Sequence, residues 1–353
     1  PFFDAATGSL GQGLSVAAGL AAAARLDGCD KRIYCIIGDG EAREGQIAEA
    51  LDFIVDNKLT NVIPIFSANG QGQSDYVSPQ QSVDGLTKKL EAYGYDVKVI
   101  DGHAWDDIFD ALTAKANSAP IAVVAKTVKG WGVSEFLTSN YHGKPLPTAK
   151  MDQAMADLDE LSAQLGVKDA VDVPAINVTK PEPVARPVVQ TINAGSFSAA
   201  LEVLGMKDAL EKKKLSTRRA YGVALAACGA ADSRIVATDG DVQGSTFTNI
   251  FAQRFPDRYF EAKIAEQNMI SFASGLSAGG RIAFASSFAK FLIRACDQIE
   301  MASNSCANIK LVGSHSGVSL AADGPSQMGL CDLAFMRSFA RSTRPDGQPA
   351  IQV

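Results

Sequence analysis

The chain has 353 residues, 46% of them hydrophobic and 20% charged, and a formal net charge of −6. That length and apolar content can fill the cores of two domains, so the composition excludes a disordered chain. The negative charge argues against a broad nucleic-acid-binding or membrane-surface role but leaves room for a local basic pocket. The sequence has no run of eighteen apolar residues, which argues against a membrane-spanning helix.

Six cysteines occur without a CxxC pair, and most of them have apolar sequence neighbours. This pattern predicts reduced, buried thiols, as in cytosolic proteins. The chain opens with Pro-Phe-Phe and no Met, so it stays open whether a targeting peptide was lost or never sequenced. The six cysteines are Cys29, Cys35, Cys228, Cys296, Cys306 and Cys331.

The first half of the chain alternates predicted helices and strands. Residues 11–26 predict an Ala/Leu-rich helix whose small side chains suit close packing against a sheet or another helix. Two apolar strands, 33–37 and 62–66, flank a helix over 41–57, which is the strand–helix–strand unit of a parallel sheet. Further helices are expected over 80–93 and 105–117, and further strands over 95–101 and 121–126.

Polar residues follow the first two strands, at the edge where parallel sheets bind ligands. Asp39 lies between Gly38 and Gly40, and Asn69 follows the next strand thirty positions later. Oxygen ligands from this pair and from the main chain of Gln71 suit a small hard cation, which usually also binds phosphate. The glycines let the backbone approach a bulky anion, and the following helix offers free N–H groups. The alternative is a tight turn whose Asp39 caps that helix.

Residues 150–215 differ from what precedes them. An exposed helix is followed by an extended Pro/Val-rich segment, which predicts a domain linker. The second half then repeats the first in outline, because its strand 234–237 leads into a Thr-Asp-Gly-Asp segment. We therefore expect two α/β domains of related topology. The remaining elements are expected as helices over 218–230 and 267–279 and strands over 259–263 and 309–312.

Several candidate residues have an ordinary structural interpretation. His103, after the third strand, is expected to be a turn residue that caps the next helix. Glu266 begins a predicted helix, where the helix dipole favours an acidic residue. Phe288, Phe291 and Arg294 fall on one face of a predicted helix at i, i+3 and i+6, where aromatic side chains usually belong to a core.

The spacing of several motifs resembles that of a known family. Gly38-Asp39-Gly40, Glu44-Gly45, Glu49-Ala50 and Asn69 together resemble the thiamine-diphosphate motif, and most closely that of transketolases. That family also has a GSLGQG segment before the motif, here residues 8–13, and an HGKPL segment after it, here residues 142–146. The resemblance runs from Thr7 to Phe339 apart from the linker.

The resemblance implies an α/β fold of two thiamine-diphosphate-binding-type parallel-sheet domains joined by a long linker. Residues 1–149 would form the diphosphate-binding domain, 150–215 the linker and 216–353 the pyrimidine-binding domain. The sequence resembles an animal-type short form that is truncated at both ends, so each domain is expected to be incomplete. Exposed sheet edges and apolar faces are expected to follow.

By resemblance, the cofactor is thiamine diphosphate with Mg²⁺ or Ca²⁺, and the metal ligands are Asp39, Asn69 and Gln71. Glu266 would protonate the pyrimidine ring, and Lys129 would lie near the diphosphate. The other implied cofactor contacts are Gly8, Leu10, Gly40, Glu44, Gln73, His142, Phe288, Phe291 and Arg294. Glu44 would also lie near the contact between subunits.

The implied reaction is that of a transketolase, which moves a two-carbon unit from a ketose phosphate to an aldose phosphate in the pentose phosphate pathway or Calvin cycle. Glu266, His142 and His315 would be the catalytic residues, and the histidines would move protons to and from sugar hydroxyls. The implied substrate contacts are His142, Arg218, Ser245, His315, Asp323 and Gln327. The resemblance implies a homodimer whose active site lies between subunits, with neither nucleic acid nor membrane as partner.

Two other functions stay open. The chain could be a truncated non-catalytic subunit that binds thiamine diphosphate and Mg²⁺, or an enzyme similar to 1-deoxyxylulose-5-phosphate synthase. The IAEQN, FAKF and SHSGVS segments, at 264–268, 288–291 and 314–319, favour transketolase. A cytoplasmic location is expected, and a plastid stays open because the N-terminal segment is absent.

Overall fold

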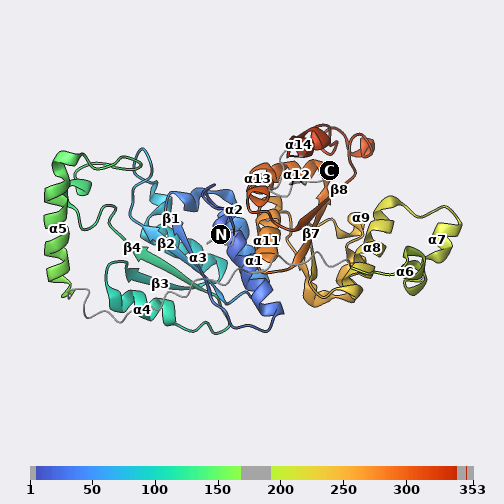
Figure 1. Ribbon diagram of the computed structural model, residues 1–353, viewed down its shortest axis with the longest axis horizontal. Helices are drawn as coiled ribbons and strands as arrows, with labels where there is room; N and C mark the ends of the chain where they lie inside the picture. Colours follow the sequence, from blue (N-terminus) through green and yellow to red (C-terminus); the bar gives the residue numbers. More distant parts are fainter. Residues whose placement is uncertain (1–4, 168–191, 340–346, 348–353) are drawn as a thin grey trace.

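The computed structural model describes residues 5–167, 192–339 and 347 (Figure 1). It contains two four-stranded sheets in which all neighbouring strands are parallel. This arrangement confirms the predicted α/β fold with two parallel-sheet domains. In Figure 1 the first sheet lies to the left and the second to the right, with helices α1 (Gly13–Leu26), α2 (Gly45–Asp56) and α11 (Glu266–Ala278) between them.

The first sheet has the strand order β1-β2-β4-β3, and the second has the order β6-β5-β7-β8. The strands of the first are β1 (Ile33–Gly38), β2 (Val62–Ala68), β3 (Asp96–Asp101) and β4 (Ile121–Lys126). Those of the second are β5 (Ile235–Asp239), β6 (Tyr259–Glu261), β7 (Ile282–Phe288) and β8 (Ile309–Ser314). Gly38 pairs with Ser67, and Phe288 with Ser314, so the carboxyl ends of neighbouring strands meet at one edge of each sheet.

Helices cover both faces of the first sheet because its strands alternate their side chains between the faces. Ile37, Phe66 and Val124 pack with α1, α2 and α3 (Val83–Tyr93). Ile63 and Val123, on the opposite face, pack with α4 (Trp105–Thr113). The remaining helices are α5 (Met151–Gln164), α6 (Phe197–Val203), α7 (Lys207–Glu211), α8 (Thr217–Ala231), α9 (Gln243–Thr246), α10 (Asn249–Arg254), α12 (Ala289–Leu292), α13 (Cys296–Asn304) and α14 (Asp332–Phe339).

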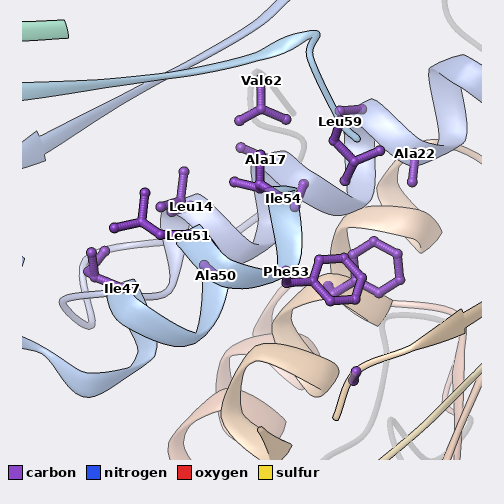
Figure 2. Close-up of a cluster of buried hydrophobic side chains, with 14 of the residues drawn as sticks. Leu14, Ala17, Ala22, Ile47, Ala50, Leu51, Phe53, Ile54, Leu59 and Val62 are labelled. Carbon is purple, nitrogen blue, oxygen red and sulfur yellow. The ribbon is translucent and has the colours of Figure 1, made fainter. Parts of the chain in front are cut away.

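The two domains share one hydrophobic core, which is centred on α1, α2 and α11. Figure 2 shows its first-domain side, including Leu14 and Ala17 of α1 and Ile54 of α2. Phe53 of α2 meets Phe272 of α11 with ring centroids 4.6 Å apart. The small residues of α1 therefore pack against another helix, as one of the two predicted arrangements requires.

Two predicted helices differ in the structure. The helix expected over 41–57 is interrupted, because Glu44 has an extended backbone (φ −62°, ψ 132°) between a 3-10 turn and α2. The single helical face expected for the aromatic segment was wrong. Phe288 ends β7, Phe291 lies in the four-residue helix α12, and Arg294 lies in the next 3-10 turn. Aromatic residues suit a strand as well as a helix, and here the strand extends to the first of them.

The prediction of six buried thiols was also wrong. All six cysteines are free, but Cys29, Cys306 and Cys331 are exposed and the other three are only half-buried. Cys29 and Cys306 each lie in a connection from a helix to a strand, where apolar neighbours in the sequence do not cover the side chain.

The predicted linker is only partly extended. Its exposed helix is α5, while the Pro/Val-rich segment at 168–191 lies outside the described residues. After it come α6 and α7, which the sequence pattern did not predict. Leu201 of α6 is fully buried against Val223 and Ala226 of α8, so residues near 200 pack on the second domain.

The described part of the first sheet has β1 at one edge, and Ile36 on this strand is 75% exposed. This agrees with the expected apolar exposure at a sheet edge. Among residues 5–167 and 192–339, no helix combines the length and apolar character needed to span a membrane.

Candidate active site

The carboxyl edge of the first sheet brings Asp39 and Asn69 together. Asp39 is 2% exposed, and its Oδ2 accepts hydrogen bonds from the backbone N–H groups of Asn69 (2.8 Å) and Gly70 (2.6 Å). Its Oδ1 accepts from the Gly40 N–H at 2.7 Å, and Asn69 Oδ1 accepts from the Gln71 N–H at 2.9 Å. The carboxylate joins two neighbouring strand ends and does not cap α2, whose N-terminus has no side-chain cap.

Two residues that sequence reasoning missed support this edge. Glu41 accepts hydrogen bonds from the backbone N–H groups of Gly11 (2.8 Å) and Gly38 (3.1 Å), which ties the GSLGQG loop to the end of β1. Gln81 is buried, and its Nε2 donates to the main-chain carbonyl of Asp39 at 2.7 Å. Glu41 had a sequence signal, because it is an acidic residue directly after the Gly-Asp-Gly turn.

Other predicted cofactor contacts lie on the surface near this edge. Gly8 and Gly11 both have positive φ angles, of 113° and 89°, which glycine adopts without strain. A Cβ on Gly11 would lie 2.7 Å from the Cβ of Glu44, so the loop passes directly over the start of α2. The side chains of Leu10, Glu44 and Gln73 are exposed.

Lys129 and His142 lie beside the loop that follows Asn69, at a cavity of about 190 Å³. Lys129 Nζ donates to the main-chain carbonyl of Gly72 at 3.0 Å and lies 3.3 Å from His142 Nδ1. Asn140 Nδ2 donates to the same carbonyl at 3.2 Å. A cationic side chain and an imidazole therefore meet close to the predicted metal ligands.

The expected capping role of His103 was wrong, because α4 has no side-chain cap. Its Nε2 instead accepts from the Val128 N–H at 2.9 Å, and its ring stacks on Trp131 with centroids 4.3 Å apart. His103 therefore fixes the segment that leads from β4 to Lys129.

In the second domain, Glu266 is buried at the start of α11, with 4% of its surface exposed. Arg294 Nη1 lies 3.9 Å from Glu266 Oε2. Glu49 approaches from α2 of the first domain, and its Oε2 accepts from the Asn268 N–H at 3.0 Å. Burial raises the pKa of Glu49, and the carboxylate of Glu266 raises it further. Two carboxyl groups from different domains thus lie near one helix N-terminus.

A third group forms where β7 and β8 end. The His315 ring lies 4.3 Å from the Phe288 ring, which in turn stacks on Phe291 with centroids 5.0 Å apart. Burial lowers the pKa of His315, the positive charge of Arg218 lowers it further, and Asp323 opposes both. At neutral pH this imidazole is therefore mainly uncharged.

Arg218 lies in the first turn of α8 and donates to the main-chain carbonyl of Ser245. The structure thus brings Arg218, Ser245, His315 and Asp323 into one region. Gln327 is half-buried and bonds through its main chain, from its N–H to the Gly324 carbonyl at 3.1 Å.

The donor set at the first edge fits a hard cation with a diphosphate. The available donors are one carboxylate, one amide oxygen and main-chain carbonyls, and these are the ligand types that Mg²⁺ and Ca²⁺ prefer. In the part of the chain that the structure describes, no group of three or more His, Cys, Asp or Glu residues could hold a metal. A site at Asp39 must therefore use amide and carbonyl oxygens.

Comparisons with known proteins agree along the chain. Residues 1–172 match the family description "Transketolase, thiamine diphosphate binding domain", and residues 213–344 match "Transketolase, pyrimidine binding domain". The mouse protein named "Transketolase" is 41% identical over 352 residues, which cover 97% of this chain and 53% of the mouse protein. The chain belongs to the transketolase family. It spans about half the length of the curated relatives it matches.

Solved transketolase structures share the fold. The enzyme from Campylobacter jejuni superposes with a TM-score of 0.68 at 21% identity, over 95% of this chain and 56% of that one. A Pichia stipitis transketolase in complex with sedoheptulose 7-phosphate gives a TM-score of 0.65 at 17% identity, over 96% of this chain and 57% of that one.

Proposed function

We propose that this chain supplies the diphosphate-binding and pyrimidine-binding half-sites of a transketolase. The reaction moves a two-carbon unit from a ketose phosphate to an aldose phosphate, as in the pentose phosphate pathway or the Calvin cycle. The observation that carries the proposal is the buried Asp39 carboxylate bound to the Asn69–Gly70 backbone at a parallel-sheet edge, in a chain of this family. The free cysteines support a reducing, cytoplasmic setting.

The first domain would hold the metal and the diphosphate. Asp39, Asn69 and the main chain of Gln71 would provide oxygen ligands to Mg²⁺ or Ca²⁺. Lys129 would place its positive charge against the diphosphate, since its Nζ already lies at the Gly72 carbonyl of the same loop. Gly40, with nothing within 4 Å of the position a Cβ would take, leaves room for a close anion. Gly8, Leu10, Glu44 and Gln73 would line the surrounding surface.

The second domain would hold the ring end of the cofactor and control protons there. Thiamine diphosphate, when bound, supplies the electron sink that C–C bond cleavage needs. Glu266 would hold a proton at the pyrimidine ring nitrogen, and its burial keeps bulk water away from that proton. Phe288 and Phe291 would provide the apolar wall for the ring, and Arg294 would balance the charge of Glu266.

The substrate would lie between the imidazoles and the arginine. His315 is mainly neutral at pH 7 and can therefore both accept and donate a proton at a sugar hydroxyl. His142 would do the same from the first domain. Arg218 and Ser245 would bind the distal phosphate, while Asp323 and Gln327 would bond sugar hydroxyls. The Pichia stipitis structure, which contains a sugar phosphate, supports this substrate class.

We also propose a homodimer in which the two half-sites of one active site come from different subunits. Within one chain, β4 and α5, which precede and follow the segment with Lys129 and His142, lie on the opposite side of the α1–α11 pair from α12 and α14 (Figure 1). Mixing Asp39→Asn and Glu266→Gln chains tests this. Heterodimers would contain one intact site and one doubly changed site, so activity would return to about a quarter of the wild-type value. A mixture as inactive as each variant alone would place the site within a single chain.

A second candidate is a non-catalytic subunit that binds thiamine diphosphate and Mg²⁺ through the same oxygen ligands at the edge of the first sheet. Titration calorimetry with thiamine diphosphate and Mg²⁺ should be combined with an assay of xylulose 5-phosphate plus ribose 5-phosphate. Binding with turnover supports the transketolase, and binding without turnover supports the non-catalytic subunit. Turnover of pyruvate as donor would instead indicate an enzyme similar to 1-deoxyxylulose-5-phosphate synthase.

A further inference from the structure

One buried carboxylate organises the turn between β5 and α10, residues 240–248. Asp239 is fully buried, and its Oδ1 accepts from the Val242 N–H at 2.7 Å. Its Oδ2 accepts from the hydroxyls of Thr246 (2.6 Å) and Thr248 (2.8 Å), which are buried as well. Because these three donors come from both ends of α9, the carboxylate fixes the whole turn.

The same turn, which includes Ser245, contacts α8 beside Arg218. Phe247 lies between the two threonines with a left-handed backbone (φ 66°), which a bulky residue keeps only when its surroundings hold it there. The guanidinium groups of Arg218 and Arg219 lie 5.5 Å and 5.2 Å from the centre of its ring. Gly222 lets α8 come this close, because a Cβ there would lie 2.3 Å from the Phe247 carbonyl oxygen.

The charge state of Asp239 suits three donors. The pKa of Asp239 is raised to about 6 in total. Burial raises it most, the hydrogen bonds from Thr246, Val242 and Thr248 lower it, and the nearby Glu261 raises it. Tyr221 and Tyr259 also interact with this carboxylate. At neutral pH the group is therefore charged and can accept from all three donors, whereas an amide in its place would turn an N–H group toward at least one of them.

We propose that Asp239 is a positioning residue for the phosphate group of the substrate. It acts through the turn 240–248, which holds Ser245 against the guanidinium of Arg218. This inference rests on the proposed function, which assigns those two residues to the sugar phosphate. Asp239 itself has no direct contact with substrate in this scheme.

The test compares variants of the turn by their affinity for ribose 5-phosphate. The full chain is loaded with thiamine diphosphate and Mg²⁺, and no ketose donor is added, so that nothing turns over. Thr248→Val removes one hydroxyl donor at nearly constant shape, and Thr248→Ser keeps it. Loss of one charge-assisted hydrogen bond should weaken binding about tenfold in Thr248→Val and in Asp239→Asn, while Thr248→Ser stays within about twofold of wild type.

The affinity for thiamine diphosphate separates positioning from general damage, because it should stay unchanged in all three variants. Equal ribose 5-phosphate affinity in Thr248→Val, Asp239→Asn and wild type would overturn the role of Asp239 and leave the proposed function standing. A parallel loss of thiamine diphosphate affinity would also overturn it, in favour of a purely structural role. If wild type does not bind ribose 5-phosphate, the phosphate assignment of Arg218 and Ser245 fails, and this inference fails with it.

Discussion

A methyl group at the α1–α11 crossing is expected to weaken the core that the two domains share. Gly275 of α11 faces α1, and a Cβ at this position would lie 2.1 Å from the Val16 carbonyl oxygen and 3.0 Å from the Gly19 Cα. Both contacts are with backbone, so no side chain can rotate away. Gly275→Ala therefore requires the helices to separate by about 1 Å, since a carbon and an oxygen that are not bonded pack at more than about 3 Å.

The cost can be worked out from two opposing effects. Overpacking a filled core typically costs about 1–3 kcal/mol, and this position belongs at the upper end because rigid backbone lies on both sides. Replacing glycine by alanine inside a helix returns roughly 0.5–1 kcal/mol. We expect a net loss of about 2 kcal/mol in the free energy of unfolding. The contact of Phe53 with Phe272 should loosen too, because it bridges the same helices.

Urea unfolding followed by circular dichroism measures this loss as a lower midpoint. Gly45→Ala is the matched control, because Gly45 also lies in a helix but has nothing within 4 Å of its would-be Cβ. The control should be neutral or slightly stabilising. If Gly275→Ala unfolds at the same urea concentration as Gly45→Ala, the helix crossing is not tightly packed, and the shared core proposed from it is wrong.

Three further outcomes are expected. Asp39→Asn removes the charge at the first sheet edge and should weaken binding of thiamine diphosphate with Mg²⁺ by about tenfold or more in titration calorimetry, so unchanged affinity would place the metal elsewhere. Glu41→Gln can keep only one of the hydrogen bonds from Gly11 and Gly38 and should lower the unfolding free energy by about 1–2 kcal/mol, whereas the exposed Glu44→Gln should leave it unchanged. Burial raises the pKa of Asp239 to about 6 from 3.8. The stability that the folded state gains from protonating this carboxyl group is therefore complete below about pH 4 and is lost as the pH rises through 6. Wild type should therefore gain about 1 kcal/mol relative to Asp239→Asn between pH 8 and pH 5, and a constant difference would contradict the raised pKa.

Strands β1, β2 and β4 could be predicted closely because each is a mainly apolar run that ends at, or just before, a polar or glycine residue. The predicted strand 62–66 corresponds to β2 at 62–68, and 121–126 coincides with β4. The segment around Phe288 could not be assigned in this way, because aromatic residues at helical spacing also suit a strand end. The sequence similarly indicated that the small residues of α1 pack closely, but not that their partner is α11, more than 240 residues later.

Glu41 and Gln81, which sequence reasoning missed, share a physical property with His103, whose role it predicted wrongly. Glu41, Gln81 and His103 each bond a backbone group that lies 25 to 42 residues away, apart from the bond of Glu41 to Gly38. A backbone group can belong to any residue type, so no spacing of particular residues in the sequence identifies the partner. Asp39 was found because a glycine on each side marks a ligand-binding turn, yet its observed partners are also backbone N–H groups. Residues predicted to contact a ligand thus leave a motif, whereas the residues that shape the backbone around them become visible only in the fold.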